Sequence, residues 1–149
     1  MVATGEIKRT LWDNSWAEFS LPAACANRSR AIPNSGDTFA VQRSPHQGEL
    51  ARLTVALSRA SADEATRQAA VWIETDDANY SDLGTLVTRP ANSAFGGNRA
   101  IHEIETARAM KICDEAGIDV TGKRIWRDKR KVLEGLDDED LRKWLEEKQ

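Results

Sequence analysis

The N-terminal third of the chain carries short apolar and aromatic runs separated by turn-forming residues. Residues 7–12 and 16–21 are two such runs, and the Asp13-Asn14-Ser15 sequence between them is typical of a turn. A further short run covers residues 38–41. This pattern predicts several short strands, with Cys25 following the second of them after Pro22.

Beyond residue 44 the apolar residues recur at helical spacing. Ser44-Pro45 predicts the start of a helix, because serine caps helices and proline fits their first position. Ser61 and Glu64 predict a second capping box, at the start of the helix that carries Gln68. The apolar stripes of these two helices are predicted at Leu50, Leu53 and Leu57, and at Ala65, Ala69, Trp72 and Ile73.

The C-terminal half is predicted to be mostly helical. The predicted elements are a loop over 76–84, a strand over 83–87, a surface loop over 89–98, a helix over 100–116 stopped by Gly117, an amphipathic segment over 121–136, and a last helix capped by Asp137. We therefore expect an α+β fold, in which a small antiparallel β-sheet from the N-terminal third packs against four to five helices. The length of 149 residues fits a single domain, 1–149, with 118–149 as a C-terminal helical extension.

Composition and charge narrow the classes of partner. The net charge of −3 gives no reason to expect nucleic acid, and the basic residues from Lys123 to Lys131 alternate with acids like a solvated helix face. No apolar run is long enough to predict membrane insertion. Residues 1–6 do not look like a signal peptide, so we expect either a cytoplasmic protein or one whose leader lies outside this sequence. Two cysteines are too few for a disulfide framework, although the sequence allows a single disulfide between Cys25 and Cys113.

Candidate chemistry comes from one cysteine and one glutamine. Cys25 lies in the sequence Leu-Pro-Ala-Ala-Cys-Ala-Asn, which ends at Asn27 and is followed by Pro33. Gln68 opens the sequence Gln-Ala-Ala-Val-Trp, which ends at Trp72 and runs into Thr-Asp. A thiol and a carboxamide held together away from water can condense to a thioester with loss of ammonia.

Together these two motifs resemble the thioester domains of bacterial surface proteins, over about residues 21–87. The resemblance implies that Gln68 is the acyl donor, that Cys25 is the thiol leaving group, and that a lysine amine of a target protein is the nucleophile. It also implies that Trp72 supports the packing and that Asn27 positions the cysteine loop. The sequence departs from the family at Arg67, where threonine is usual, and at Ala26, where a bulky residue is typical.

The resemblance further implies an extracellular, adhesin-like module that needs no cofactor and reacts once, so it is not an enzyme. The alternative is a non-enzymatic structural or protein-interaction domain with unreacted Cys25 and a docking surface on the charged C-terminal helices. A cysteine hydrolase is disfavoured, because neither His46 nor His102 lies in a recognisable signature. Alternating Asp77, Asn79 and Ser81 lack the remainder of a calcium loop and read as turn residues, so no metal is expected.

Overall fold

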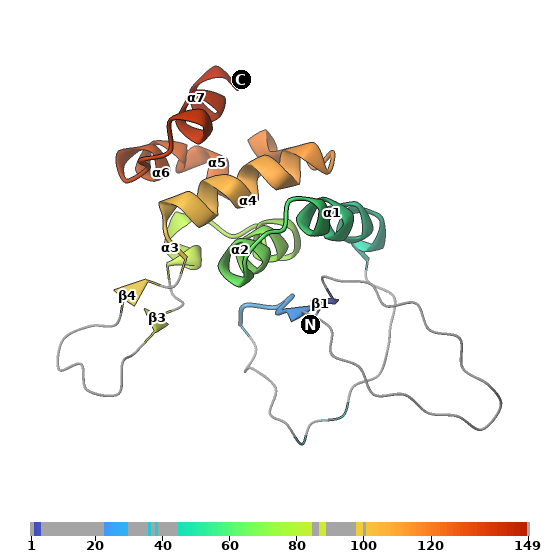
Figure 1. Ribbon diagram of the computed structural model, residues 1–149. Coiled ribbons are helices and arrows are strands. Elements are labelled where there is room, and N and C mark those ends of the chain that lie inside the picture. Colours follow the sequence, from blue (N-terminus) through green and yellow to red (C-terminus); the bar gives the residue numbers. More distant parts are fainter. Residues whose placement is uncertain are drawn as a thin grey trace.

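The computed structural model describes residues 2–3, 23–29, 36, 38, 45–84, 87–88, 98–99 and 101–148. Helices dominate this part of the chain, and two short antiparallel strand pairs accompany them (Figure 1). Strand β1 (Val2–Ala3) pairs with β2 (Ala23–Ala24), and β3 (Val87–Thr88) pairs with β4 (Asn98–Arg99). The α+β class expected from the sequence is confirmed. The strands predicted at 7–12 and 16–21, and residues 39–41 of the third, lie outside the described residues.

The helical elements of the described part are α1 (Gln47–Arg59), α2 (Glu64–Thr75), α3 (Tyr80–Leu83), α4 (Glu103–Glu115), the 3-10 turn η1 (Val120–Gly122), α5 (Arg124–Arg127), α6 (Lys129–Glu134) and α7 (Glu139–Glu147). Helices α1 and α2 lie side by side with α4 across them, and α5 to α7 cover the other side of α4 (Figure 1). Helix α2 is thereby enclosed by α1, α4 and β2, and each residue from Ala69 to Glu74 is buried.

The core follows the predicted apolar stripes. Leu50, Leu53 and Leu57 of α1 are buried as expected, and so are Ala69, Trp72 and Ile73 of α2. Residues from the C-terminal region, including Ile125, Val132 and Leu145, belong to the same apolar cluster. Burial of these side chains on both faces of α4 holds α2 in place, and α2 carries Gln68.

The predicted helix starts are wrong by one to three residues. Helix α1 begins at Gln47 with His46 as its N-cap, later than the Ser44-Pro45 start. The N-cap of α2 is Asp63, whose side chain accepts a hydrogen bond from the Thr66 N–H at 2.7 Å. Ser61 has φ +48°, whereas an N-cap residue needs extended backbone, so it cannot cap this helix. Helix α7 is capped by Asp138 instead of the neighbouring Asp137.

The segment after α2 is more ordered than predicted. The expected loop over 76–84 contains the short helix α3, which begins with a reciprocal capping box between Asn79 and Asp82. Leu83 belongs to this helix, so the next strand starts only at Val87. Gly117 follows α4 with φ +74°, the left-handed conformation that favours glycine, and its predicted role as a helix stop is confirmed.

Candidate functional site

Strand β2 delivers Cys25 to the side of α2. Ala24, the last residue of the strand, is paired with Val2 of β1 and is buried, and β2 contacts α2. Cys25 follows immediately and is half-buried. Gln68 lies on a helix, as expected. Cys25 follows a strand, but this strand is β2 (Ala23–Ala24), and the predicted run over 16–21 lies outside the described residues. Gln68 lies within α2, and Cys25 directly follows β2, the strand that contacts this helix.

The side chain of Gln68 lies against the backbone of Cys25. The Cys25 N–H donates a hydrogen bond to Gln68 Oε1 at 2.9 Å, and Gln68 Nε2 donates to the Cys25 carbonyl oxygen at 2.9 Å. The carboxamide thus pairs with both backbone groups of one residue, much as a neighbouring strand would. These contacts join residues 43 positions apart and place the glutamine carboxamide beside the Cys25 backbone.

The residues after Cys25 are held along the C-terminal half of α2. The Arg28 N–H donates to Asp76 Oδ1 at 3.2 Å, at the end of α2. The Arg28 guanidinium lies 3.0 Å from Asp82 Oδ1 on α3. Together with the Cys25–Gln68 pair, these contacts fasten the Cys25 segment at two places. Sequence reasoning missed Arg28 and Asp82, because no local pattern links residues so far apart.

Asn27 has a local role in the turn after Cys25. Its Oδ1 accepts hydrogen bonds from the Ser29 N–H at 3.2 Å and from Ser29 Oγ at 2.8 Å. This is an Asx-type turn, which redirects the chain after β2. The contact is compatible with the predicted role of Asn27 in shaping the cysteine loop.

Trp72 lies one helical turn after Gln68 and is only 5% exposed. Among the residues that the structure describes, its indole Nε1 is buried without a hydrogen-bond partner. The neighbouring Ala69 and Ala70 are fully buried. Gln68 is thus followed along α2 by buried apolar side chains, with the Trp72 N–H as a buried donor among them.

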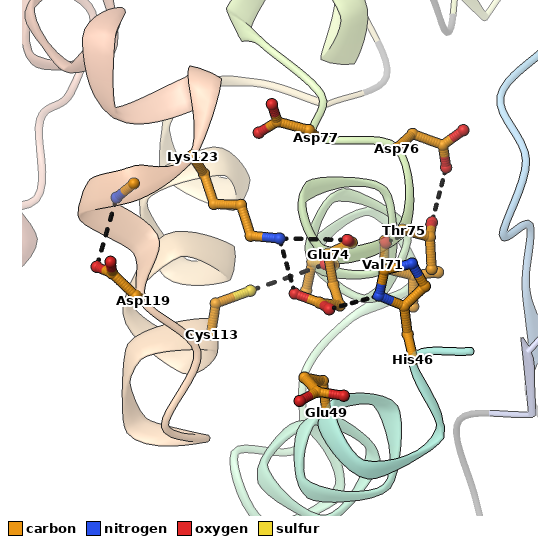
Figure 2. Close-up of polar contacts among 12 residues, drawn as sticks. His46, Glu49, Val71, Glu74, Thr75, Asp76, Asp77, Cys113, Asp119 and Lys123 are labelled. Carbon is orange, nitrogen blue, oxygen red and sulfur yellow. Dashed lines mark hydrogen bonds and ion pairs between the residues drawn. The ribbon is translucent and has the colours of Figure 1, made fainter. Parts of the chain in front are cut away.

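The C-terminal end of α2 holds a buried charged group (Figure 2). The Glu74 side chain is 3% exposed, with Lys123 Nζ 3.0 Å from Oε2 and His46 Nδ1 3.2 Å from Oε1. Lys123 Nζ also donates to the Glu74 carbonyl oxygen at 3.3 Å. The interpretation of Lys123 as part of a solvated basic face is therefore wrong, because its ammonium group turns inward to Glu74. A shallow cleft of about 640 Å³ opens beside this cluster and is also lined by Asp76, Asp77 and Asp119.

The second cysteine is separate from this chemistry. Cys113 on α4 is fully buried, and its Sγ lies 3.7 Å from the Ala70 carbonyl oxygen. Burial, reinforced by the nearby Glu74 carboxylate, raises the pKa of the Cys113 thiol far above its usual range. Both cysteines are free, so the Cys25–Cys113 bridge that the sequence left open does not form.

The remaining candidates have structural contacts. His46 meets Glu74, and His102 caps α4 while its backbone N–H donates to Glu105 Oε2 at 2.8 Å. Asp77 accepts a hydrogen bond from the Arg124 N–H at 2.8 Å, and Asn79 caps α3. Over the described residues, no group of three or more histidine, cysteine or carboxylate side chains is arranged to hold a metal ion. No helix in that part of the chain is long and apolar enough to cross a membrane.

Comparison with known proteins assigns no family, because no protein-family model, no curated protein and no solved structure matches the chain. The function therefore has to be argued from the site itself.

Proposed function

We propose that the chain is a thioester-domain-like module, in which Cys25 and Gln68 form an internal thioester that then acylates an amine on a target protein. The observation that supports this proposal is the pair of 2.9 Å hydrogen bonds between the Gln68 carboxamide and the Cys25 backbone. A bond between two side chains forms far faster when the fold already holds the reacting groups together. The proposed activity needs an accessible target amine, so display outside the cell belongs to the same proposal.

The first step is the condensation of Cys25 with Gln68. Cys25 Sγ attacks Gln68 Cδ, the electron pair of the carbonyl moves to Oε1, and collapse of this intermediate expels Nε2. The thiol proton is transferred to the departing nitrogen, which leaves as ammonia. Because the Cys25 N–H already donates to Oε1, a donor is in place where negative charge develops. The half-buried position of both residues limits the water that could intercept the product.

The second step is aminolysis of the thioester. The amine nitrogen attacks the same carbonyl carbon, the carbon–sulfur bond breaks, and the Cys25 thiolate leaves. A proton passes from the attacking nitrogen to the sulfur, and an isopeptide bond joins Gln68 to the target. The thioester is consumed in this step, so each molecule reacts once and does not turn over as an enzyme does.

A second candidate function rests on the same contacts. The Gln68 carboxamide satisfies both backbone groups of Cys25 where β2 ends, and this alone would pin the N-terminal segment to α2. In that case the chain is a structural or protein-interaction domain with an unreacted thiol. The two candidates differ in covalent chemistry and not in fold.

The deciding experiment is the intact mass of the purified protein before and after treatment with methylamine. The thioester proposal expects a mass lower by one ammonia, and then uptake of one methylamine that maps to Gln68. Cys25→Ala and Gln68→Ala should both keep the plain mass and take up no amine, whereas the control Gln47→Ala on α1 should behave like the parent. A parent mass equal to the plain sequence, with Cys25 open to alkylation, refutes the thioester and leaves the structural domain.

A further inference from the structure

We propose that the indole N–H of Trp72 is a second hydrogen-bond donor to the carbonyl oxygen of the Cys25–Gln68 thioester, which makes Trp72 a catalytic residue and not only a packing residue. This inference rests on the proposed function and adds to it a group that acts on the reacting atoms.

The indole N–H of Trp72 is a buried donor without an acceptor in the described part of the chain. Trp72 is 5% exposed, and within the described ranges its Nε1 has no hydrogen-bond partner. A buried indole N–H normally finds an acceptor, since losing its water without replacement is unfavourable. The missing hydrogen bond is explained if the acceptor of this N–H, or the negative charge on that acceptor, forms only during the reaction.

Trp72 and Gln68 lie one turn apart on the same helix. Trp72 follows Gln68 by four residues on α2, so the two side chains share one face of the helix. Side chains on a helix lean toward its N-terminus and cover the preceding turn. In our proposal the Trp72 ring lies over the turn that carries Gln68, so that its N–H meets the carbonyl oxygen once the thioester has formed. Ala69 and Ala70 between them are small and fully buried, so α2 is packed closely here.

The Gln68 carbonyl oxygen gains negative charge during the reaction and is stabilised by hydrogen-bond donors. Within the part of the chain that the structure describes, Gln68 Oε1 accepts one hydrogen bond, from the Cys25 N–H at 2.9 Å, and a carbonyl oxygen has a second lone pair. When the amine attacks, the carbonyl electrons move to this oxygen, and they return when the Cys25 thiolate leaves. Two donors aimed at such an oxygen form the usual oxyanion site of acyl transfer. Cys25 supplies one from its backbone, and Trp72 would supply the other.

The test is the rate at which methylamine opens the thioester in Trp72→Phe, followed by intact mass. Phenylalanine keeps an aromatic ring but has no N–H, so we expect the rate to fall about 100-fold, as for other single oxyanion donors. The matched control is Trp144→Phe on α7, which removes a half-buried indole far along the chain and should leave the rate unchanged. A merely structural Trp72 gives an unchanged rate.

Stability is measured separately in the Cys25→Ala background, where no thioester can form. There Trp72→Phe should still unfold cooperatively, and its urea midpoint should fall more than that of Trp144→Phe, because a smaller ring leaves space at a 5% exposed site. This fall is independent of the thioester, whereas the rate of its opening is not. If Trp72→Phe does not fold, benzothienylalanine at position 72 replaces the N–H by sulfur at nearly constant shape, and the same rate loss is expected. A parent without a thioester refutes the proposed function itself, whereas a parent with a thioester that Trp72→Phe opens at the parent rate refutes only the role of Trp72.

Discussion

Replacing Gln68 by methionine tests the contact on which the proposed site depends. The change is made in the Cys25→Ala background, so that no thioester can form and only non-covalent contacts are compared. Residue 25 keeps its backbone N–H and carbonyl group there. Methionine has nearly the length of glutamine but lacks the carboxamide, so both 2.9 Å hydrogen bonds are lost together.

The expected loss follows from these two bonds. A hydrogen bond of this kind contributes about 0.5–1.5 kcal/mol net, so two bonds contribute about 1–3 kcal/mol to the free energy of unfolding. For a chain of this length, 1 kcal/mol corresponds to about 2–4 °C in the melting temperature. The variant should therefore melt about 2–12 °C below its Cys25→Ala parent.

Thermal unfolding followed by circular dichroism measures this difference, with urea unfolding as a second reading. The matched control is Gln47→Met at the exposed start of α1, where the same chemical change should have little effect. If Gln68→Met melts no lower than Gln47→Met, then Gln68 does not hold the Cys25 segment, and the geometric basis of the thioester proposal is lost.

Three further predictions follow from other contacts. Lys123→Met should lower the free energy of unfolding by about 3–5 kcal/mol, because it removes the lysine cation from the 3% exposed Glu74 carboxylate. In urea unfolding, adding Glu74→Gln should restore most of this loss, whereas losses that simply add up would contradict the pairing. Arg28→Ala should lower the free energy of unfolding by less than about 1 kcal/mol, since its ion pair with Asp82 is partly exposed. Intact mass should nevertheless show that a smaller fraction of the protein carries the thioester, and an unchanged fraction would show that this contact does not position the cysteine segment. Cys113 should resist iodoacetamide in the folded protein at pH 8, because burial raises the pKa of its thiol and little thiolate forms. It should react once the protein is unfolded in urea. Peptide mass mapping locates the label, and rapid labelling of Cys113 without denaturant would contradict its burial.

Where local pattern dictates structure, the sequence was sufficient. Leucines at helical spacing fixed the buried face of α1, and Gly117 stopped α4 because glycine readily takes the left-handed conformation. The cysteine and glutamine motifs also named a possible chemistry from residue types alone. These features depend on a few consecutive residues, whose preferences act locally before distant parts of the chain meet.

Helix starts show where local pattern stops being enough. Ser61 and Asp63 are both good capping residues, and the sequence cannot tell which of the two takes extended backbone. The structure turns Ser61 into the left-handed region and leaves the cap to Asp63. The choice depends on how α1 and α2 pack, because the four residues between the helices must join them at the angle that this packing sets.

The contacts that make a site were decided only by tertiary structure. Strand β2 and helix α2 had to pack together before the Gln68 carboxamide could reach Cys25 across 43 residues. Lys123 turned from solvent toward Glu74 for the same reason, since burial of α2 left that carboxylate in need of a cation. The sequence by itself determined which groups can react or carry charge. Only the fold brought these groups into contact. A contact between residues far apart in sequence stabilises the protein only where it outweighs the chain entropy lost in closing the loop between them.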